Sequence, residues 1–378
     1  MRADANFLDM YLHATGISDV PPQYTRWVAL TVIAAAVEDR VWAQKAANDP
    51  RVIPNLYTIL TGPSGVSKGR AIGFGMKLLN ERIHLHYGSA TYKSLVDYMV
   101  AGNSRFLLVM PELASDMGGR KLADMMVKHL TEWYTAFDQK MTEGTRGHGL
   151  LEYDPPTINA LFGTTTEWLV ESISKEAVAS GFFGRSIVIN AEYDFQNMVY
   201  ETTVPPDYEQ CLGELKRRLR EMTHMKGEFK LTAAAKELDK YWFHTRREPK
   251  PGMEPFFQRE AVLVLKLAML MSLTDGFNLV IDVAHIEAAH TLVAEIRQYL
   301  PHVMEECLAD PVTRCYRWVL RIAGSRGRTN RKYLTSLGRT LGYSRNIIGE
   351  ALIMGEMEGV FKNKRIGSED YVYYIEAK

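Results

Sequence analysis

The chain has 378 residues, of which 46% are hydrophobic, and this is enough apolar material for two or three packed domains. Its 45 basic residues balance its 45 acidic residues, so the whole molecule has no net field to attract nucleic acid or a membrane, and any such attraction must be local. The three cysteines form no C-x-x-C pair or Cys/His cluster in the sequence, which argues against a metal site and favours a reducing compartment.

Two apolar runs, residues 27–37 and 261–273, are the longest in the chain. Both are shorter than the roughly 20 residues that cross a bilayer, so we expect them to be core helices. The N-terminal sequence "MRADANFLDMYL" lacks the basic start and following apolar stretch of a signal peptide. We therefore expect no membrane association and a cytoplasmic location.

Residues 1–50 carry apolar side chains at helical spacing, with "VPPQY" between two helices, and are expected to form an N-terminal helical region. Over residues 51–200, short β-rich runs alternate with amphipathic segments. The expected strands are "LYTIL" (56–60), "RFLLVM" (105–110), "TINALFG" (157–163) and "RSIVIN" (185–190). Strands separated by segments of helical length predict an α/β core, in which a largely parallel sheet has helices on both faces.

Residues 201–308 have a helical pattern and are expected to form a helical lid or bundle. Residues 309–378 differ, because three short helical segments precede the alternating "VFKNKRIGSEDYVYYIEAK". Three helices followed by a two-stranded ribbon are the outline of a C-terminal winged helix.

The segment "TGPSGVSKGRAI" (61–72) follows the first expected strand and opens a helix, as the loop G-x-x-x-x-G-K-[ST] of P-loop NTPases does. Gly62 and Lys68 match this motif, whereas Ser67 replaces its second glycine and Gly69 replaces the hydroxyl residue that binds Mg²⁺. A simple Gly/Ser turn would explain the glycines but not a lysine at this offset. Since the amides at a helix N-terminus favour an anion, we interpret the segment as a nucleotide site for ATP and Mg²⁺.

The second expected strand runs into "RFLLVMPELAS", at the place where P-loop NTPases carry an acidic metal ligand and often a glutamate for the attacking water. Glu112 fits the second role, but Pro111 stands at the position of the metal ligand. The simpler alternative is that Glu112 is a solvated carboxylate at a strand end. Together with Gly69, both usual side-chain metal ligands are absent, which leaves Mg²⁺-dependent hydrolysis open.

Four stretches in order resemble a family of P-loop proteins of phages and mobile elements, grouped as a domain of unknown function beside primase-helicases. They are "GPSGVSKGRAI", "VMPELAS", the region from "LTEWYTAFDQK" to "TTTEWL", and "GFFGRSIVI". The resemblance runs from about Phe7 to Leu300 and implies a P-loop NTPase core of the RecA-like or AAA+ class. A phage subset of this family is similar to the chain in having Lys-Gly and Pro-Glu-Leu in place of the usual residues.

The resemblance also implies roles for individual residues. Glu112 would polarise the attacking water, and Thr164 would be the polar sensor of the terminal phosphate, although Thr164 or Thr165 could instead cap the following helix. Arg185 would be a finger that reaches a nucleotide on a neighbouring subunit, unless it forms a surface ion pair. Arg259 would contact the nucleotide of its own subunit. The loop residues that would bind the nucleotide are Gly62, Pro63, Ser64, Gly65, Val66, Ser67, Lys68, Gly69 and Arg70.

Two basic segments are candidates for binding DNA. The first is a projecting hairpin expected over residues 137–154, with Lys140, Arg146 and His148 among glycines, which resembles the pore loops of ring ATPases or is a solvated turn. The second is residues 312–366, where twelve Lys and Arg stand against three Glu. A winged helix with this charge fits duplex or forked DNA, with docking to a protein as the alternative. Its candidate DNA-binding residues are Arg331, Lys332, Arg345, Asn346, Lys362 and Lys364.

The leading hypothesis is an ATP-dependent, DNA-translocating ring ATPase of phage or mobile-element replication. It would be a helicase-like homo-oligomer, expected to be a hexamer, in the cytoplasm of a phage-infected or element-bearing cell, with other replication proteins as further candidate partners. The second hypothesis is a weakly or non-hydrolysing, nucleotide-gated helicase loader or initiation adaptor, because both metal ligands are replaced. The third is a transcriptional regulator that uses the winged helix, with the core as an oligomerisation platform.

Overall fold

A computed structural model of the protein describes residues 5–16, 18–117, 120–135, 140–145, 149–173, 181–192, 199, 201–249, 252–340 and 342–375. The chain divides into two compact units, Met1–Cys307 and Leu308–Lys378. The N-terminal region, the α/β core and the expected lid therefore share one unit, and the second unit begins within one residue of the expected C-terminal boundary. Among the described helices, none combines the length and the apolar character that a bilayer crossing requires.

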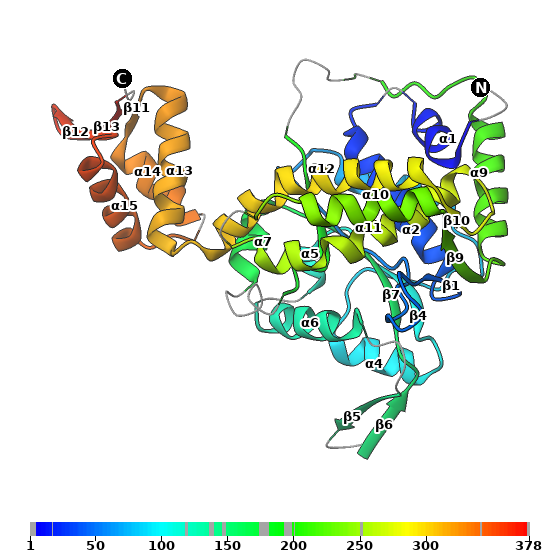
Figure 1. Cartoon of the computed structure of the whole chain (residues 1–378). Helices are drawn as coiled ribbons and strands as arrows, with labels where there is room; N and C mark the ends of the chain where they lie inside the picture. Colours follow the sequence, from blue (N-terminus) through cyan, green and yellow to red (C-terminus); the bar gives the residue numbers. More distant parts are fainter. Residues whose placement is uncertain are drawn as a thin grey trace. The chain divides into compact units, whose positions relative to one another are not determined.

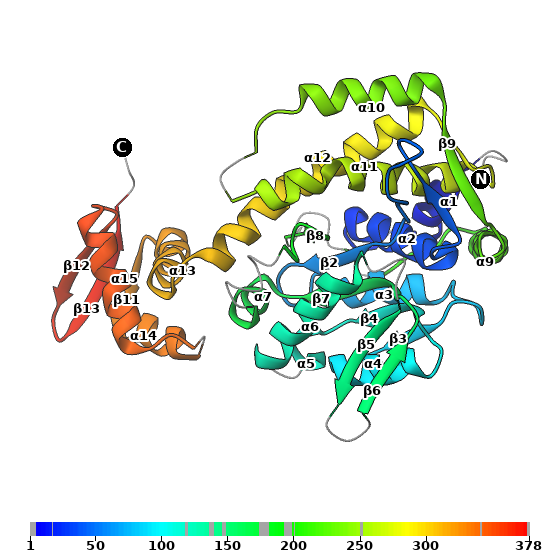
Figure 2. The ribbon, with the colours of Figure 1, turned by 60° about the horizontal axis from the view of Figure 1, so that its bottom comes forward.

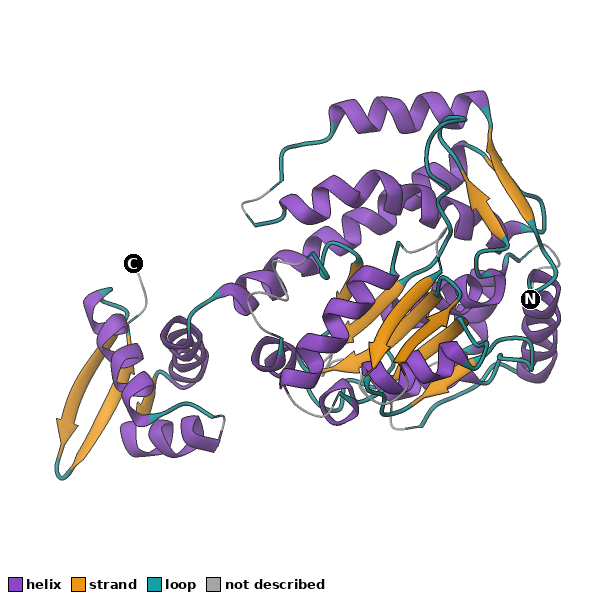
Figure 3. Cartoon of the chain, turned by 90° about the horizontal axis from the view of Figure 1, so that it is seen from below, coloured by secondary structure: helices purple, strands orange, loops and turns teal. Residues whose placement is uncertain are grey.

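The first unit is built on a five-stranded parallel sheet with the strand order β3-β4-β7-β2-β8. Figure 1 labels β4 and β7 of this sheet, Figure 2 also labels β2, β3 and β8, and Figure 3 draws the strands in orange. The α/β class and the parallel sheet expected from the sequence are confirmed. Strand β3 was not expected, because this short edge strand leaves Leu85 and Tyr87 exposed and lacks an apolar run. The strands are β2 (Tyr57–Thr61), β3 (Leu85–Tyr87), β4 (Arg105–Met110), β7 (Thr157–Thr164) and β8 (Ser186–Asn190).

Helices cover both faces of this sheet, and two neighbouring residues of β2 show which helix lies on which face. The hydroxyls of Thr58 and Thr31 lie 2.7 Å apart, which places α2 (Pro22–Val37) on one face. The hydroxyl of Tyr57 donates to the carbonyl oxygen of Leu130 at 3.1 Å, which places α6 (Arg120–Trp133) on the other. Successive side chains of a strand point to opposite faces, so α2 and α6 lie on opposite sides of the sheet.

Other helices complete these two layers. Helix α3 (Lys68–Met76) packs against α2, and Val28 of α2 lies against Gly75 of α3, where a side chain would not fit. The shorter helices near the sheet are α4 (Tyr92–Val100), α5 (Leu113–Asp116) and α7 (Thr166–Ser172).

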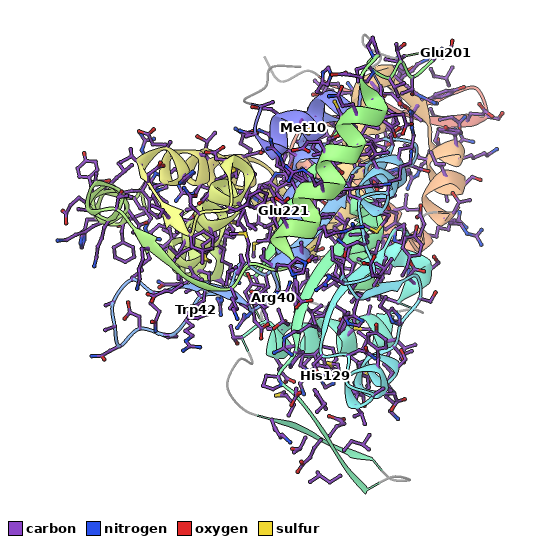
Figure 4. The ribbon with its side chains drawn as sticks, turned by 90° about the vertical axis from the view of Figure 1, so that its right-hand side faces the viewer. Met10, Arg40, Trp42, His129, Glu201 and Glu221 are labelled. Atoms are coloured by element: carbon purple, nitrogen blue, oxygen red, sulfur yellow. The ribbon has the colours of Figure 1, made fainter. Side chains whose placement is uncertain are left out.

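The expected lid contains the predicted helices and also two strands of a small sheet that was not expected from the sequence. Strands β1 (Val41–Ala43), β9 (Gly227–Leu231) and β10 (Val280–Ile281) form a parallel sheet of order β1-β9-β10. The helices expected in residues 1–50 and 201–308 are present, but the strands in these regions were not expected. Strands β1 and β10 have three and two residues, which are too few to show a period, and in β9 only Phe229 is buried. The helices around this small sheet are α1 (Phe7–Ala14), α9 (Tyr208–Met222), α10 (Ala233–Thr245), α11 (Glu254–Asp275) and α12 (Val283–Leu308). Figure 4 shows α9, labelled at Glu221, beside α1, labelled at Met10.

The expected hairpin is present as the antiparallel pair β5 (Met141–Thr145) and β6 (Gly149–Tyr153). It pairs with no strand of the central sheet among the described residues and extends away from that sheet (Figure 2). Its turn, residues 146–148, lies outside the described residues. At its base, the indole nitrogen of Trp133 donates to the hydroxyl of Tyr153 at 3.2 Å, which ties the hairpin to α6.

The second unit has three helices and a three-stranded antiparallel sheet of order β11-β13-β12. The helices are α13 (Pro311–Arg326), α14 (Arg331–Thr340) and α15 (Arg345–Met357), and the strands are β11 (Arg328–Asn330), β12 (Phe361–Ile366) and β13 (Glu369–Tyr374). Strand β11 adds a third strand to the expected two-stranded ribbon. The unit has its own core, in which Trp318, Leu334, Ile348 and Val372 meet.

Candidate functional site

The glycine-led loop lies between the end of β2 and the start of α3. Gly62 has φ of +151°, and a Cβ there would lie 2.4 Å from the carbonyl oxygen of Ala191, so the position excludes a side chain. Gly65 has φ of +93°, and Ser67 has φ of +50°, a left-handed conformation that is uncommon outside glycine. Ser67, which replaces the second glycine of the motif, therefore has a backbone conformation that glycine adopts more readily.

Lys68 folds back over this loop. Its Nζ donates to the carbonyl oxygens of Gly62 and Pro63, both at 2.8 Å, and the residue is only 8% exposed. Burial lowers the pKa of Lys68, and the negative charges of Glu112 and Glu167 oppose that shift. The cation is thus held within the loop, with carboxylates close enough to favour its charged form.

Ser67 and Arg70, which were expected to flank phosphates, both contact Asp19. The Ser67 hydroxyl donates to Asp19 Oδ2 at 2.8 Å, and the Arg70 guanidinium donates to Asp19 and to the hydroxyl of Thr202. Asp19 was not expected from the sequence, since it lies 48 residues before Ser67 in a polar connection with no motif. The Asp19 carboxylate therefore connects the segment between α1 and α2 to the nucleotide loop.

Gly69 lies in the first turn of α3 and is exposed. A Cβ at this position would meet nothing within 4 Å. The missing hydroxyl is therefore not explained by a lack of space. The first amides of a helix have no partner within the helix, so those at the start of α3 are available to an anion.

Glu112 and Thr164 reach the same edge of the sheet as the loop. Strand β7 lies between β2 and β4, and Thr164 pairs with Thr61, the last residue of β2. Glu112 is exposed just beyond the end of β4. Because parallel strands end at one edge, the loop, Thr164 and Glu112 are brought together there. A Cβ on Gly163 would lie 2.3 Å from the carbonyl oxygen of Pro111, so this glycine permits the close approach of the two strand ends.

The two threonines at the end of β7 have different roles. Thr165 caps α7, because its hydroxyl accepts from the amide of Trp168 at 3.2 Å. The capping alternative therefore holds for Thr165. Thr164 is 2% exposed and donates to the carbonyl oxygen of Thr165 at 3.2 Å, so it stays at the strand end.

A second carboxylate, Asp116, lies beside Glu112. One oxygen of Asp116 accepts from the hydroxyl of Ser89 at 3.0 Å, and the other from the amide of Glu112 at 3.4 Å. The N-cap residue of α5, Glu112, and its last residue, Asp116, thus present two carboxylates at this edge, beside Pro111, which stands at the position of the usual metal ligand.

Arg185 and Arg259 lie together at the opposite edge of the sheet. Ser186, which follows Arg185, pairs with Tyr57 at the start of β2, about 17 Å along the strand from Gly62. A Cβ on Gly181 would lie 3.0 Å from Nη1 of Arg185 and 3.7 Å from Nη2 of Arg259. Burial and the neighbouring Arg259 lower the pKa of Arg185.

The position of these two arginines corrects the expectation that Arg259 contacts the nucleotide of its own subunit. It also tests the alternative that Arg185 forms a surface ion pair. Arg259 lies beside Arg185 and at the far edge from the loop, so it is not placed to contact a nucleotide bound to its own chain. Within the described residues neither arginine forms an ion pair, and Nε of Arg185 is buried without a hydrogen-bond partner. A surface ion pair is therefore not what holds Arg185.

A third cation, Lys266, lies near these arginines and was not singled out from the sequence. Its Nζ donates to the carbonyl oxygen of Asn55 at 3.1 Å and lies 4.0 Å from the centre of the Tyr134 ring. Burial lowers the pKa of Lys266 well below its usual value, and Arg185 lowers it further. Lys266 is 2% exposed, so it is part of the core beside the two arginines.

The residues expected to bind DNA lie in the hairpin and in the second unit. Lys140 is exposed before β5, whereas Arg146 and His148 lie outside the described residues. Arg331 and Lys332 begin α14, and exposed Arg345 and Asn346 begin α15. Lys362 and Lys364 are exposed on β12.

Away from the loop, His13, Asp207 and Cys211 offer ligand atoms that lie within 4.8 Å of one another and could hold a cation. The Nε2 of His13 is 2.8 Å from Asp207 Oδ1, and this contact lowers the pKa of Asp207 to about 2. The sequence contains no signal for this group, because His13 and Asp207 are 194 residues apart.

Comparison of the chain with protein-family models and with curated proteins finds no match.

Proposed function

We propose that this protein binds ATP at the loop of residues 62–67 and hydrolyses it as a ring-forming, helicase-like ATPase that moves along DNA. The observation that carries the proposal is the meeting of Lys68, Glu112 and Thr164 at one edge of a parallel sheet, beside a loop that starts with a glycine no other residue can replace. A cation, a carboxylate and a hydroxyl around a phosphate-sized loop suit phosphoryl transfer from a nucleotide to water.

The donors at this edge fit a triphosphate. The Lys68 ammonium, the free amides of the first turn of α3 and the left-handed loop residues all present positive or donating groups. On binding, Lys68 would exchange the carbonyl oxygens of Gly62 and Pro63 for phosphate oxygens. Glu112 would accept a hydrogen bond from the attacking water and orient it, while Thr164 would contact the terminal phosphate.

The fit to Mg²⁺ depends on carboxylates that are not in the usual motif positions. Gly69 and Pro111 offer no side-chain oxygen, whereas Glu112 and Asp116 lie together at the end of β4. Magnesium commonly keeps several waters and binds through one or two carboxylates and the phosphates of the substrate, so Asp116 would hold the ion while Glu112 orients the attacking water. The ion would neutralise charge on the phosphates.

Ring formation is proposed from the position of Arg185 and Arg259. Among the described residues, Arg185 and Arg259 have no carboxylate partner, and both guanidinium groups stand far from the loop of their own chain. In a ring, the same edge would face the nucleotide of the neighbouring subunit, where guanidinium groups neutralise charge that develops during phosphoryl transfer. We propose a hexamer as the ring, with Arg185 as the finger and Arg259 beside it acting on the same neighbour.

A second candidate function is a nucleotide-gated helicase loader or initiation adaptor that does not hydrolyse ATP. The open space at Gly69 favours it, since the chain could carry a metal-binding hydroxyl there and does not. In that case the loop would switch between empty and nucleotide-bound forms without turnover.

Phosphate release separates the two functions. Purified protein is incubated with ATP and Mg²⁺, with and without single-stranded DNA, and nucleotide binding is measured in parallel with a fluorescent ATP analogue. The motor predicts phosphate release that DNA stimulates. Binding of ATP with no release in the presence of DNA contradicts the motor and supports the adaptor.

A further inference from the structure

Helix α15 is the element that a winged helix would insert into a DNA groove, yet its exposed face is poorly suited to DNA. Beyond Arg345 and Asn346 at its start, its exposed residues are Glu350, Ile353, Glu356 and Met357. Carboxylates and apolar side chains along this face would meet phosphates and base edges without offering donors.

The outer face of the three-stranded sheet, in contrast, carries basic and aromatic side chains. Thr329, Phe361 and Val372 are buried and point to the core of the unit, so the residues that alternate with them point outward. Direct cross-strand partners share a face, and they form two rows. The rows are Arg328–Tyr373–Lys362 and Asn330–Tyr371–Lys364.

Each row therefore places a tyrosine between polar or basic neighbours. The Arg328 guanidinium lies 5.6 Å from the centre of the Tyr371 ring. Glu369 is the carboxylate on this face of β13, and its Oε2 accepts from Asn330 at 2.9 Å and from the Tyr371 hydroxyl at 3.0 Å. This face therefore has three cations, Arg328, Lys362 and Lys364, and the Glu369 carboxylate already accepts hydrogen bonds from residues of the same face.

We propose that the outer face of the sheet β11-β13-β12 binds single-stranded nucleic acid. Tyr371 and Tyr373 would stack on two successive unpaired bases, being about 7 Å apart along β13. Arg328, Lys362 and Lys364 would contact the backbone phosphates on either side. The inference deepens the proposed function by naming single strands, in place of duplex, as the ligand of the second unit.

Stacking on tyrosine rings needs bases that are free of their partners, and this favours a single strand over a duplex. Cations that flank the rings attract the backbone of any sequence, so little base preference is expected.

The test measures fluorescence anisotropy of labelled oligo(dT) and of a blunt duplex of equal length, with the full chain and without ATP. Tyr371→Ala and Tyr373→Ala should each weaken oligo(dT) binding by about 5-fold or more. Tyr371→Phe and Tyr373→Phe should retain the affinity, because the ring remains. Arg321→Ala, at an exposed cation on α13, is the matched control and should change the affinity less than twofold.

A second measurement keeps the proposal testable if a tyrosine variant fails to fold, which circular dichroism reports. Lys362→Ala and Lys364→Ala remove exposed side chains and should each reduce the slope of log affinity against log salt by about 0.7 for a single strand. Unchanged oligo(dT) affinity and salt slope in these variants would overturn the proposal, as would tighter binding to the duplex that Arg345→Ala abolishes. Repeating the assay with Lys68→Ala separates this result from any failure of the ATPase.

Discussion

Lys68 donates from Nζ to the carbonyl oxygen of Gly62 at 2.8 Å, so the lysine expected to contact phosphates closes its own loop. Lys68→Ala should weaken ATP binding by about 10-fold or more, because a charge-assisted hydrogen bond contributes roughly 1.5–3 kcal/mol. Titration with a fluorescent ATP analogue measures this loss. Lys77→Ala, at an exposed lysine just after α3, is the control and should bind ATP normally. Equal affinity in the Lys68 variant would contradict the nucleotide site.

Gly69→Ser restores the hydroxyl that the motif usually carries at this position. Since a Cβ at Gly69 meets nothing within 4 Å, the variant should fold as the wild type does. We expect phosphate release to reach half its maximum at a lower Mg²⁺ concentration, because the hydroxyl adds an oxygen ligand. Gly73→Ser, one turn later and equally uncrowded, should leave the Mg²⁺ dependence unchanged. The same Mg²⁺ dependence in both variants would show that residue 69 lies away from the ion.

Asp19→Asn removes a negative charge beside Ser67 and Arg70. Asp19 is exposed, so its effect on the loop is modest, and we expect ATP affinity to rise by a few-fold at low salt. The expected cause is that Arg70 becomes available to phosphates and that repulsion of the triphosphate falls. Isothermal titration at two salt concentrations measures it, with Asp9→Asn on α1 as the control. Weaker binding in the Asp19 variant would mean that Asp19 holds the loop in its binding conformation.

Gly163→Ala tests the close approach of β7 to the end of β4. Its Cβ would lie 2.3 Å from the carbonyl oxygen of Pro111, and such overpacking commonly costs about 1–3 kcal/mol of the free energy of unfolding. Gly73→Ala is the control, because it has open space within α3 and should be stabilising by about 0.5–1 kcal/mol. Urea unfolding followed by circular dichroism compares the two. A Gly163 variant as stable as the wild type would mean that β4 and β7 can separate without cost.

The parallel sheet, the loop, the hairpin and the C-terminal unit could be predicted because each depends on local signals. Strand β2 is an apolar run followed by glycines, and the hairpin is marked by glycines between short strands. The small sheet β1-β9-β10 could not be predicted, since Val41 and Gly227 become neighbours only in the folded chain. A strand of three residues carries too little pattern to be recognised.

The candidate site was predicted in part for the same reason. Lys68, Glu112 and Thr164 each follow or end an expected strand, and parallel strands bring their ends to one edge. The contacts of Asp19 with the loop and the position of Arg259 beside Arg185 depend on packing between distant segments. The sequence places Arg259 at the start of a long helix but contains nothing to say which edge of the sheet that helix end reaches.

Neighbouring subunits are proposed to share one ATPase site, with Glu112 on one side and Arg185 on the other. Glu112→Gln and Arg185→Ala should each bind ATP and hydrolyse it far more slowly, the second by roughly 10³-fold or more. The decisive measurement is phosphate release from a mixture of the two variants with DNA and Mg²⁺. If the site is shared, part of the activity should return, because some junctions combine an intact Glu112 with an intact Arg185. No recovery, although the subunits are shown to exchange, would contradict the shared site and leave Arg185 with a structural role.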